Sequence, residues 1–281
     1  MTKDKTIARR IQIIVAAHKA YPMPEDPMYL PVHVGAGAEG KTGAGGNPLD
    51  LGYTKDNFGD NISEKNSAYC ELTGLYWAWK HLDCDFIGLV HYRRHFTDGT
   101  KKKNPFESVL TYEKLAPMLD RYPVFVPKKR HYYIETLYSH YAHTHYAEQL
   151  DVTREIIAEH YPDYLAAYDR VAAQRYGYMF NMMIMRRDLT DAYCTWLFAI
   201  LEELENRIDD SKLDAFQGRF YGRVSEILLN VWLDGQLKIG VLQSSDVKEL
   251  PYANMEKTNW WKKGTSFLRA KFFHRRYEGS F

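Results

Sequence analysis

The chain has 281 residues with 37 basic and 36 acidic side chains, so its overall charge is not that of a nucleic-acid-binding protein. A hydrophobic fraction of 45% supports a sizeable core in one large domain or two small ones. Three cysteines without CxxC spacing argue against a disulfide framework and a zinc site, and they favour a reducing compartment. Because the N-terminal apolar run is too short for a signal peptide or a membrane span, we expect a cytoplasmic protein.

The N-terminal part begins with a predicted strand and a predicted loop. Residues 11–17 form a continuous apolar run, which is typical of a buried parallel strand, and His18 and Lys19 follow at its carboxyl end. Residues 35–52 are rich in glycine and have no periodicity. This composition predicts a mobile loop over a site.

Later segments alternate between apolar runs and helical periodicity. We expect strands at 86–90, 124–126 and 178–185, and helices at 63–81 with an N-cap at Ser63, at 134–160, at 190–208 and at 224–233, with a turn between Gly218 and Gly222. This order predicts an α/β fold with a mostly parallel central sheet, flanking helices and a helical C-terminal part. A single domain is expected over 1–253, followed by a tail over 254–281.

Charged residues come directly after one of the predicted strands. The stretch DFIGLVHYRRHF, residues 85–96, ends its apolar run in His91, Tyr92, Arg93 and Arg94. Ligands of open α/β sheets bind outside the carboxyl ends of the strands, where the first strand places its own basic residues. Arginine offers paired donors to phosphate oxygens, so the pattern predicts a diphosphate site. A solvated loop after the strand is the alternative.

Two patterns that resemble metal sites are weak. The DxD sequence at 83–85 matches metal-dependent nucleotide-sugar transferases, but it stands before the strand, at the wrong end of the sheet. His140, His143 and His145 do not share one helix face, and no HExxH pattern is present. No metal ligand is therefore predicted. Tyr141 and His145 are one helical turn apart and are expected to face a substrate together.

One carboxylate stands in an otherwise apolar helix. Glu226 follows Gly222 by four residues, at the predicted start of that helix. A carboxylate there is either a favourable partner of the helix dipole or a general base aimed into a site from a rigid element. The local residues do not choose between these two roles.

The last twenty or so residues interleave Lys and Arg with Trp, Phe and Leu. This mixture predicts a helix that lies on an anionic membrane surface. A solvated amphipathic end is the alternative. The membrane interpretation places the protein in the cytoplasm, at the inner face of the plasma membrane.

Four segments together resemble a known family. They are GDNISEKNSAYCELTGLYWAWKH, FIGLVHYRRHF, YMFNMMIMRRDL and GRFYGRVSEILLNVWL. In this order they resemble the bacterial capsular and exopolysaccharide glycosyltransferases that were long classed as a domain of unknown function. The resemblance runs from about Ile11 to Lys238 and leaves out residues 35–52 and the tail. It implies a GT-A-like fold and similarity to inverting galactofuranosyltransferases.

The resemblance also implies roles for individual residues. Glu226 is expected to be the catalytic base. Contacts to the donor and its diphosphate are expected from His18, Lys19, Asn61, Lys65, His91, Tyr92, Arg93 and Arg94. Sugar and acceptor contacts are expected from Tyr141, His145, Tyr178, Asn181 and Arg219. Because no DxD stands at the expected place, arginine charge is expected to replace a Mn²⁺ or Mg²⁺ cofactor or to assist it.

The implied reaction moves a hexose, with galactofuranose as the specific expectation, from a UDP-sugar to a hydroxyl of a growing glycan on a lipid diphosphate. Single displacement with inversion is expected, and arginine charge stabilises the leaving UDP. Two rivals stay open. One is a non-catalytic nucleotide-sugar or glycan-binding protein, and the other is a phosphate-ester hydrolase that uses His91.

Overall fold

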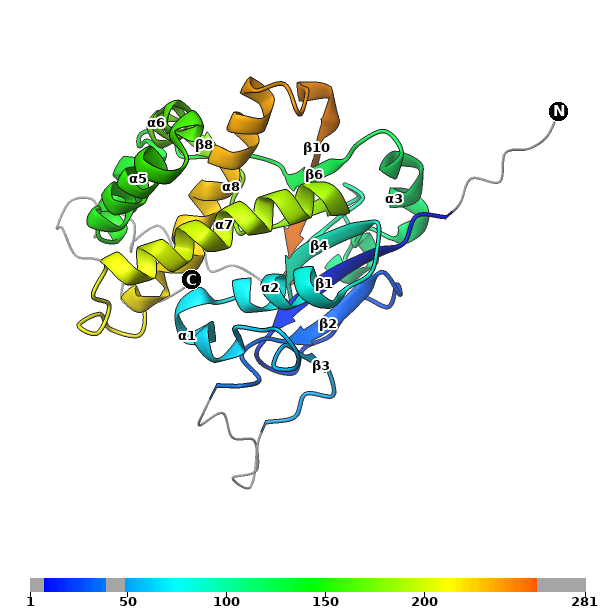
Figure 1. Ribbon diagram of the computed structural model, residues 1–281. Coiled ribbons are helices and arrows are strands. Elements are labelled where there is room, and N and C mark those ends of the chain that lie inside the picture. The colour runs from blue at the N-terminus through cyan, green and yellow to red at the C-terminus, as the bar shows by residue number, and fades with distance from the viewer. Residues whose placement is uncertain (1–7, 39–48, 257–281) are drawn as a thin grey trace.

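The computed structural model describes residues 8–38 and 49–256 (Figure 1). The strands are β1 (Ile11–Ala17), β2 (Tyr29–His33), β3 (Thr54–Lys55), β4 (Phe86–His91), β5 (Arg94–Phe96), β6 (Val124–Pro127), β7 (Arg130–His131), β8 (Tyr176–Gly177), β9 (Met183–Arg186), β10 (Val247–Leu250) and β11 (Tyr252–Asn254). The helices are α1 (Asn66–Tyr69), α2 (Leu72–His81), α3 (Tyr112–Leu119), α4 (Leu137–Thr144), α5 (Glu148–His160), α6 (Leu165–Ala173), α7 (Arg187–Arg207) and α8 (Phe220–Lys238).

One sheet organises the described chain. Its order is β10-β6-β9-β4-β1-β2-β3, with β5 and β11 continuing from β4. All neighbours along this order pair in parallel except β9, which is antiparallel to both β4 and β6. The predicted α/β class, with a mostly parallel sheet, flanking helices and a helical C-terminal part, is confirmed. The carboxyl ends of β1, β4, β6 and β10 and the start of β9 therefore share one edge of the sheet.

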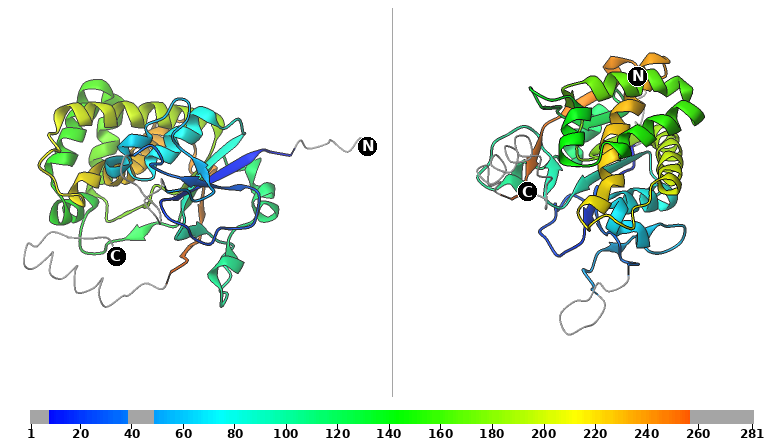
Figure 2. Two further views of the ribbon diagram at one scale, coloured as in Figure 1. Left: turned by 90° about the horizontal axis from the view of Figure 1, so that it is seen from below. Right: turned by 90° about the vertical axis from the view of Figure 1, so that its left-hand side faces the viewer.

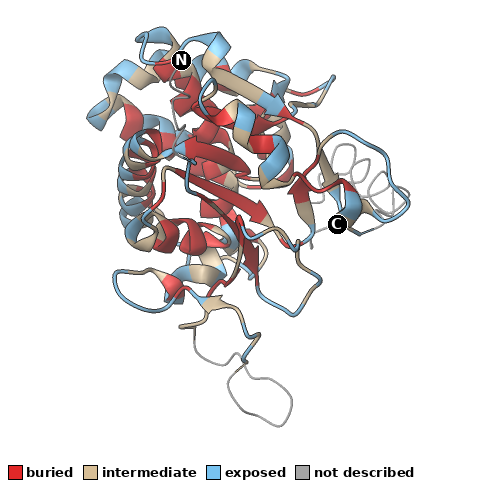
Figure 3. Cartoon of the chain, turned by 90° about the vertical axis from the view of Figure 1, so that its right-hand side faces the viewer, coloured by how far each residue is buried: buried red, intermediate tan, exposed pale blue. Residues whose placement is uncertain are grey.

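Alternating side chains of the central strands build a core on each face of the sheet. In β1, Ile14 and Ala16 join a large cluster with α2, α7 and α8, whereas Ile13 and Val15 join a smaller cluster that includes α3. Burial on both faces explains the uninterrupted apolar runs of these strands, and Figure 3 shows the buried central strands. Figure 2 shows from two further sides that α5 to α8 gather at one side of the sheet.

The single helix expected over 63–81 is wrong. A short 3-10 turn from Ser63 leads into α1, and α2 begins only at Leu72. The chain breaks between them at Cys70, which has a φ of 55°. Ser63 is not an N-cap either: it is buried, and its hydroxyl donates to the carboxylate of Asp56. The break leaves Glu71 at the sheet edge instead of inside one long helix.

The expected strand over 178–185 is also interrupted. Only β9, from Met183, continues the sheet, because Phe180 and Asn181 both adopt positive φ values of 75° and 53°. Side chains from other elements form hydrogen bonds with the backbone of this segment. Non-glycine residues in this region are uncommon and cluster at functional sites.

The expected helix over 134–160 consists of α4 and α5, separated at His145–Ala147. A capping box between Thr136 and Ser139 starts α4 three residues later than expected. The buried His145 leaves the helical conformation there, and its Nδ1 lies 3.0 Å from Oε1 of Gln217.

Helix α8 begins earlier than expected, so Gly222 does not close a turn but lies inside the helix. A Cβ atom at this position would lie 3.3 Å from both Cβ and Sγ of Cys70. Glycine therefore lets α8 pack closely against the Cys70 break. Glu226 consequently lies in the second turn of α8, not at its first residues.

The C-terminal part of the described chain holds two strands that periodicity did not predict, β10 and β11. Strand β11 runs to Asn254, one residue past the expected domain end, and pairs with β5. Residues 39–48 of the predicted loop and 257–281 of the predicted membrane tail lie outside the described residues. Within the described part, the search for a helix with the length and apolar character of a membrane span found none.

Candidate functional site

The charged cluster after β4 forms a tight hairpin. Tyr92 and Arg93 form the turn, and the chain returns as β5, with Arg94 paired to His91 across it. Tyr92 is buried, and the Lys19 ammonium lies 5.4 Å from the centroid of the Tyr92 ring. The strand therefore does not end in a solvated loop. The hairpin holds the arginines at the carboxyl edge of the sheet.

The hairpin lines a cavity of about 590 Å³, here called the arginine cavity. Its lining is Ala16, His18, Val34, Leu49, Asn66, Ser67, Cys70, Glu71, His91, Tyr92, Arg93, Arg94, Ala215 and Arg219. Three guanidinium groups face it. Nε of Arg219 donates to Cys70 Sγ at 3.1 Å, Nε of Arg94 donates to Oδ1 of Asn254 at 2.8 Å, and Arg93 lies 3.5 Å from Glu256. The cavity suits an anion with several oxygen atoms.

The strained segment Phe180–Asn181 connects this cavity to the helices behind it. Nε2 of His91 donates to the Phe180 carbonyl at 2.6 Å. The Asn181 amide donates to Oε1 of Glu71 at 2.7 Å and to the Gly222 carbonyl at 2.9 Å. The hydrogen bonds hold two consecutive positive φ values in place and fix the carboxylate of Glu71 in the arginine cavity.

A second cavity, the glutamate cavity, is lined by Phe180 and has a volume of about 210 Å³. Its lining is Arg130, Tyr132, Leu137, His140, Tyr141, Thr144, His145, Met179, Phe180, Arg223, Glu226 and Ile227. The Arg94 guanidinium, which lines the arginine cavity, lies 3.7 Å from the centroid of the Phe180 ring, which lines the glutamate cavity, so the two cavities adjoin at this pair. A ligand in one cavity is thus close to the other.

Charged groups of both cavities affect the pKa of Glu226. Burial, reinforced by the negative charge of Glu71, raises the pKa of Glu226 to about 7, although the Phe180 backbone N–H and Arg94 oppose the shift. Burial also lowers the pKa of His91. A carboxyl group with a pKa near neutrality exchanges a proton readily at physiological pH, which is the property of a general acid or base.

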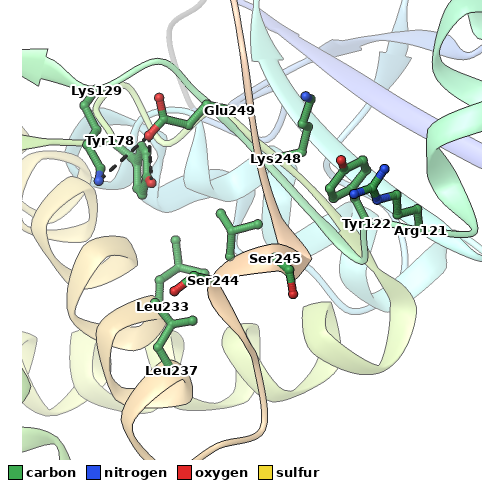
Figure 4. A pocket seen from close by; sticks show the side chains of 11 residues that line it. Arg121, Tyr122, Lys129, Tyr178, Leu233, Leu237, Ser244, Ser245, Lys248 and Glu249 are labelled. Carbon is green, nitrogen blue, oxygen red and sulfur yellow. Dashed lines mark hydrogen bonds and ion pairs between the residues drawn. The ribbon is translucent and has the colours of Figure 1, made fainter.

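A third cavity, the edge cavity, lies between the last turns of α8 and the outer strand β10 (Figure 4). Its volume is about 560 Å³. Figure 4 shows Lys129, Tyr178 and Glu249 together at one side of it, where Tyr178 donates to Glu249 at 3.1 Å and Lys129 lies 3.8 Å from the same oxygen. The hydroxyl of Tyr178, the Lys129 ammonium and the Glu249 carboxylate are therefore partners of one another.

The structure brings together many, but not all, of the residues expected at the donor. The arginine cavity contains His18 and the four residues of the hairpin. Lys19 stacks on Tyr92 but is not part of its lining. Asn61 turns away to bond its own loop at Gly59, and Lys65 pairs with Glu205 at 2.6 Å. The last two residues are therefore not brought to the cavity.

The residues expected at the sugar and acceptor are divided among different places. Tyr141 and His145 share the glutamate cavity with Glu226, with ring centroids 5.0 Å apart. Arg219 instead lies in the arginine cavity, and Tyr178 lines the edge cavity. Asn181 is buried and acts through Glu71 and α8 without lining either central cavity.

Several residues of the two central cavities were missed in the sequence. Glu71, Arg223, Arg130 and His140 all carry polar groups there. Oε2 of the buried Glu135 lies 2.8 Å from Nδ1 of His140, and its Oε1 lies 2.9 Å from Nδ1 of His143. A carboxylate five residues before the first histidine was the available signal for this group. Among the described residues, no cluster of three or more His, Cys, Asp or Glu side chains suited to a metal ion was found.

The fold is similar to that of a known glycosyltransferase. One solved structure, the apo form of the bifunctional glycosyltransferase WbbM, matches with a TM-score of 0.77 and 27% sequence identity over 88% of this chain. The match covers 46% of that protein, so this chain spans about half of its length. The likeness confirms the expected GT-A-like α/β fold. A search of curated proteins found no match.

The family comparison covers most of the residues described above. Residues 12–237, which include the β4 hairpin, the Phe180–Asn181 segment and Glu226, match one family. The chain therefore belongs to the family described as Domain of unknown function (DUF4422).

Proposed function

We propose that the protein is a glycosyltransferase that moves a hexose from a UDP-sugar to a hydroxyl group of a glycan. The observation that carries the proposal is Glu226, a carboxyl group with a pKa of about 7 that lines one cavity beside a second cavity with three arginines. The likeness to a bifunctional glycosyltransferase supports the same class of reaction.

In this proposal the arginine cavity holds the nucleotide diphosphate. Arg93 is exposed, and among the described residues its ion-pair partner is Glu256, at 3.5 Å, so its guanidinium is accessible to phosphate oxygens. Arg94 is held by Asn254 and Phe180, and Arg219 by Cys70. Fixed cations at the point where negative charge develops stabilise the transition state without reorganisation.

The glutamate cavity holds the acceptor. Ionised Glu226 takes the proton of the acceptor hydroxyl while the hydroxyl oxygen forms a bond to the anomeric carbon. The bond between this carbon and the diphosphate oxygen breaks, and its electron pair leaves with UDP. Because base and diphosphate are placed in two adjoining cavities, we propose attack from the face opposite the leaving group, with inversion.

We propose that arginine charge supplies most of the neutralisation of the diphosphate. A Mn²⁺ or Mg²⁺ ion assisting the arginines is the alternative. Galactofuranose is proposed as the donor sugar, and a lipid-diphosphate-linked capsular or exopolysaccharide glycan as the acceptor. The basic and aromatic residues of the tail at 257–281 support contact with the inner face of the plasma membrane.

A panel of nucleotide sugars tests the proposal. UDP release is measured for each donor with a glycan acceptor, with and without EDTA, and UDP-hexoses are expected to turn over in both conditions. Loss of turnover in EDTA, with recovery on adding Mn²⁺, would establish metal assistance. UDP binding without any transfer to an acceptor would favour a non-catalytic binding protein.

The hydrolase alternative has less support from the geometry. Nε2 of His91 donates its proton to the Phe180 carbonyl at 2.6 Å, so this nitrogen has no lone pair for attack on phosphorus. Burial lowers the pKa of His91, which disfavours the protonated ring that a general acid needs. A hydrolase would release phosphate from simple phosphate esters with no glycan present. Such release, together with a phosphorylated His91, would replace the transferase proposal.

A further inference from the structure

An unusual apolar tip projects beside the glutamate cavity. Strands β7 and β8 form a two-stranded ribbon, and the chain after β7 turns sharply at Tyr133. Tyr133 is 79% exposed, Ile134 66% and Tyr176 37%. These three side chains, here called the ribbon tip, are large apolar groups on a surface where such groups are normally scattered.

The fold actively holds the ribbon tip outward. Tyr133 has a φ of 55°, a conformation that a bulky residue rarely adopts. Nη1 of Arg175 donates to the Tyr133 carbonyl at 3.1 Å, and the Ile134 N–H donates to the Tyr132 carbonyl at 2.6 Å. A turn held in a strained conformation by its own hydrogen bonds is better explained by use than by chance.

Positive charge surrounds the ribbon tip. Residues 128–131 read Lys-Lys-Arg-His, and Arg175 precedes Tyr176. Two carboxylates lie near them: the buried Glu135 contacts His140 and His143, and Glu249 lies 3.8 Å from Lys129, so the cations are in excess. The Lys129 ammonium lies 5.0 Å from the centroid of the Tyr176 ring. Aromatic and aliphatic side chains rimmed by Lys and Arg match the boundary of an anionic bilayer, where the rings enter the headgroup layer and the cations meet lipid phosphates.

The position of the ribbon tip indicates its use. Tyr132, which directly precedes Tyr133, lines the glutamate cavity. Arg130 lines it too, and its partner across the ribbon is Gly177, which follows Tyr176. We propose that the ribbon tip docks the protein on an anionic lipid surface so that the glutamate cavity opens beside lipid headgroups. This inference rests on the proposed function in one respect, because it places the acceptor glycan of a lipid carrier at the cavity mouth.

A local probe tests the contact in the full-length chain. Cys84 and Cys194 are buried, and burial raises the pKa of Cys70, which borders the arginine cavity, to about 11, so a fluorophore sensitive to polarity will react preferentially with an Ile134→Cys variant. The unmodified chain, treated in parallel, measures any labelling at Cys70. We expect a blue shift of its emission with vesicles of phosphatidylcholine and phosphatidylserine, and a smaller one with phosphatidylcholine alone. The matched control is Ile239→Cys, on another exposed isoleucine after α8, which is 56% exposed and should show no shift.

A second pair of variants measures the energetic contribution of the tip. Tyr133→Ser with Ile134→Ser should lower partitioning onto the anionic vesicles about tenfold, whereas Ile239→Ser with Val241→Ser should not. Transfer to a short soluble acceptor should stay at the level of the unmodified protein in both. Failure of transfer in every variant and in the unmodified chain would refute the proposed function and leave the lipid measurement standing.

Three results would overturn the docking proposal. One is vesicle binding without a shift at residue 134, because another part of the chain would then be the contact. Another is the absence of vesicle binding. The third is a blue shift that appears without lipid and grows with protein concentration, which would identify a second copy of the chain as the occupant.

Discussion

The arginine cavity and the glutamate cavity adjoin each other but are built in different ways. In the arginine cavity, most of the charged groups belong to one contiguous hairpin after β4. Glu71 and Arg219 supply the others. The glutamate cavity collects residues from β7, α4, the segment before β9 and α8. The arginine cavity therefore displays fixed positive charge. The glutamate cavity holds one carboxyl group, and the pKa of this group depends on the elements packed around it.

This difference separates binding from chemistry. A hairpin with paired arginines recognises an anion with little further support, because guanidinium groups are always charged. A general base needs burial, a defined distance and a tuned pKa, which only several elements together provide. Substitutions in the two cavities should therefore have different effects.

The largest effect is expected at Glu226. Glu226→Gln keeps the size of the side chain but removes its ability to accept a proton, so kcat should fall by about 10³-fold. UDP affinity should remain nearly unchanged, because the diphosphate site is in the other cavity. Steady-state kinetics and calorimetry measure the two quantities. The control is Glu249→Gln, a carboxylate of the edge cavity, which should keep nearly full activity.

A contrasting result is expected for the exposed arginine. Arg93→Gln should weaken UDP binding by roughly 2 kcal/mol, about 30-fold, because it removes a charge-assisted hydrogen bond to phosphate. Calorimetry with UDP measures this loss, with Arg121→Gln in the edge cavity as the control. Unchanged affinity would remove the hairpin from the diphosphate site and end the division of roles between the cavities.

The coupling between the cavities predicts opposite shifts in pH dependence. As Glu226 acts as a base, kcat should rise with pH through about 7 and level off above it. Glu71 raises the pKa of Glu226 and Arg94 lowers it, so the rising limb should move to lower pH in Glu71→Gln and to higher pH in Arg94→Gln. Profiles of kcat against pH test the pair. Shifts in the same direction would contradict the electrostatic account.

The smallest expected effect is on stability. The folded state raises the pKa of Glu226 from 4.5 to about 7, so ionisation opposes folding above about pH 7 and has no such effect below about pH 4.5. Glu226→Gln should therefore melt at a higher temperature than the unmodified protein at pH 8, by about 2 to 4 °C for each kcal/mol gained. Calorimetric scans should show this difference shrinking as the pH falls towards 4.5. An equal difference at both pH values would show that the carboxyl group is not strained by its burial.

The sequence was most informative where function follows a contiguous pattern. The strand at 86–90 ended in charge as expected, because an apolar run and its polar end are local properties. Periodicity failed at Cys70 and Phe180, residue types that give no sequence signal for positive φ, and at Asn181, a type that tolerates positive φ without requiring it. Each failure lies next to one of the two central cavities, where tertiary contacts override local preference.

The sequence by itself determined the α/β class, the strands β1, β4 and β6, the charge that follows β4 and a carboxylate in an apolar helix. Hydrophobic periodicity and charge placement are properties of neighbouring residues, so they can be read along the chain. Only the tertiary structure decided that Glu71 raises the pKa of Glu226, that Tyr178 belongs to the edge cavity and that Arg94 contacts Phe180 where the two central cavities adjoin. Cavities and pKa values arise from distances and burial between remote segments, and these exist only once the chain has folded.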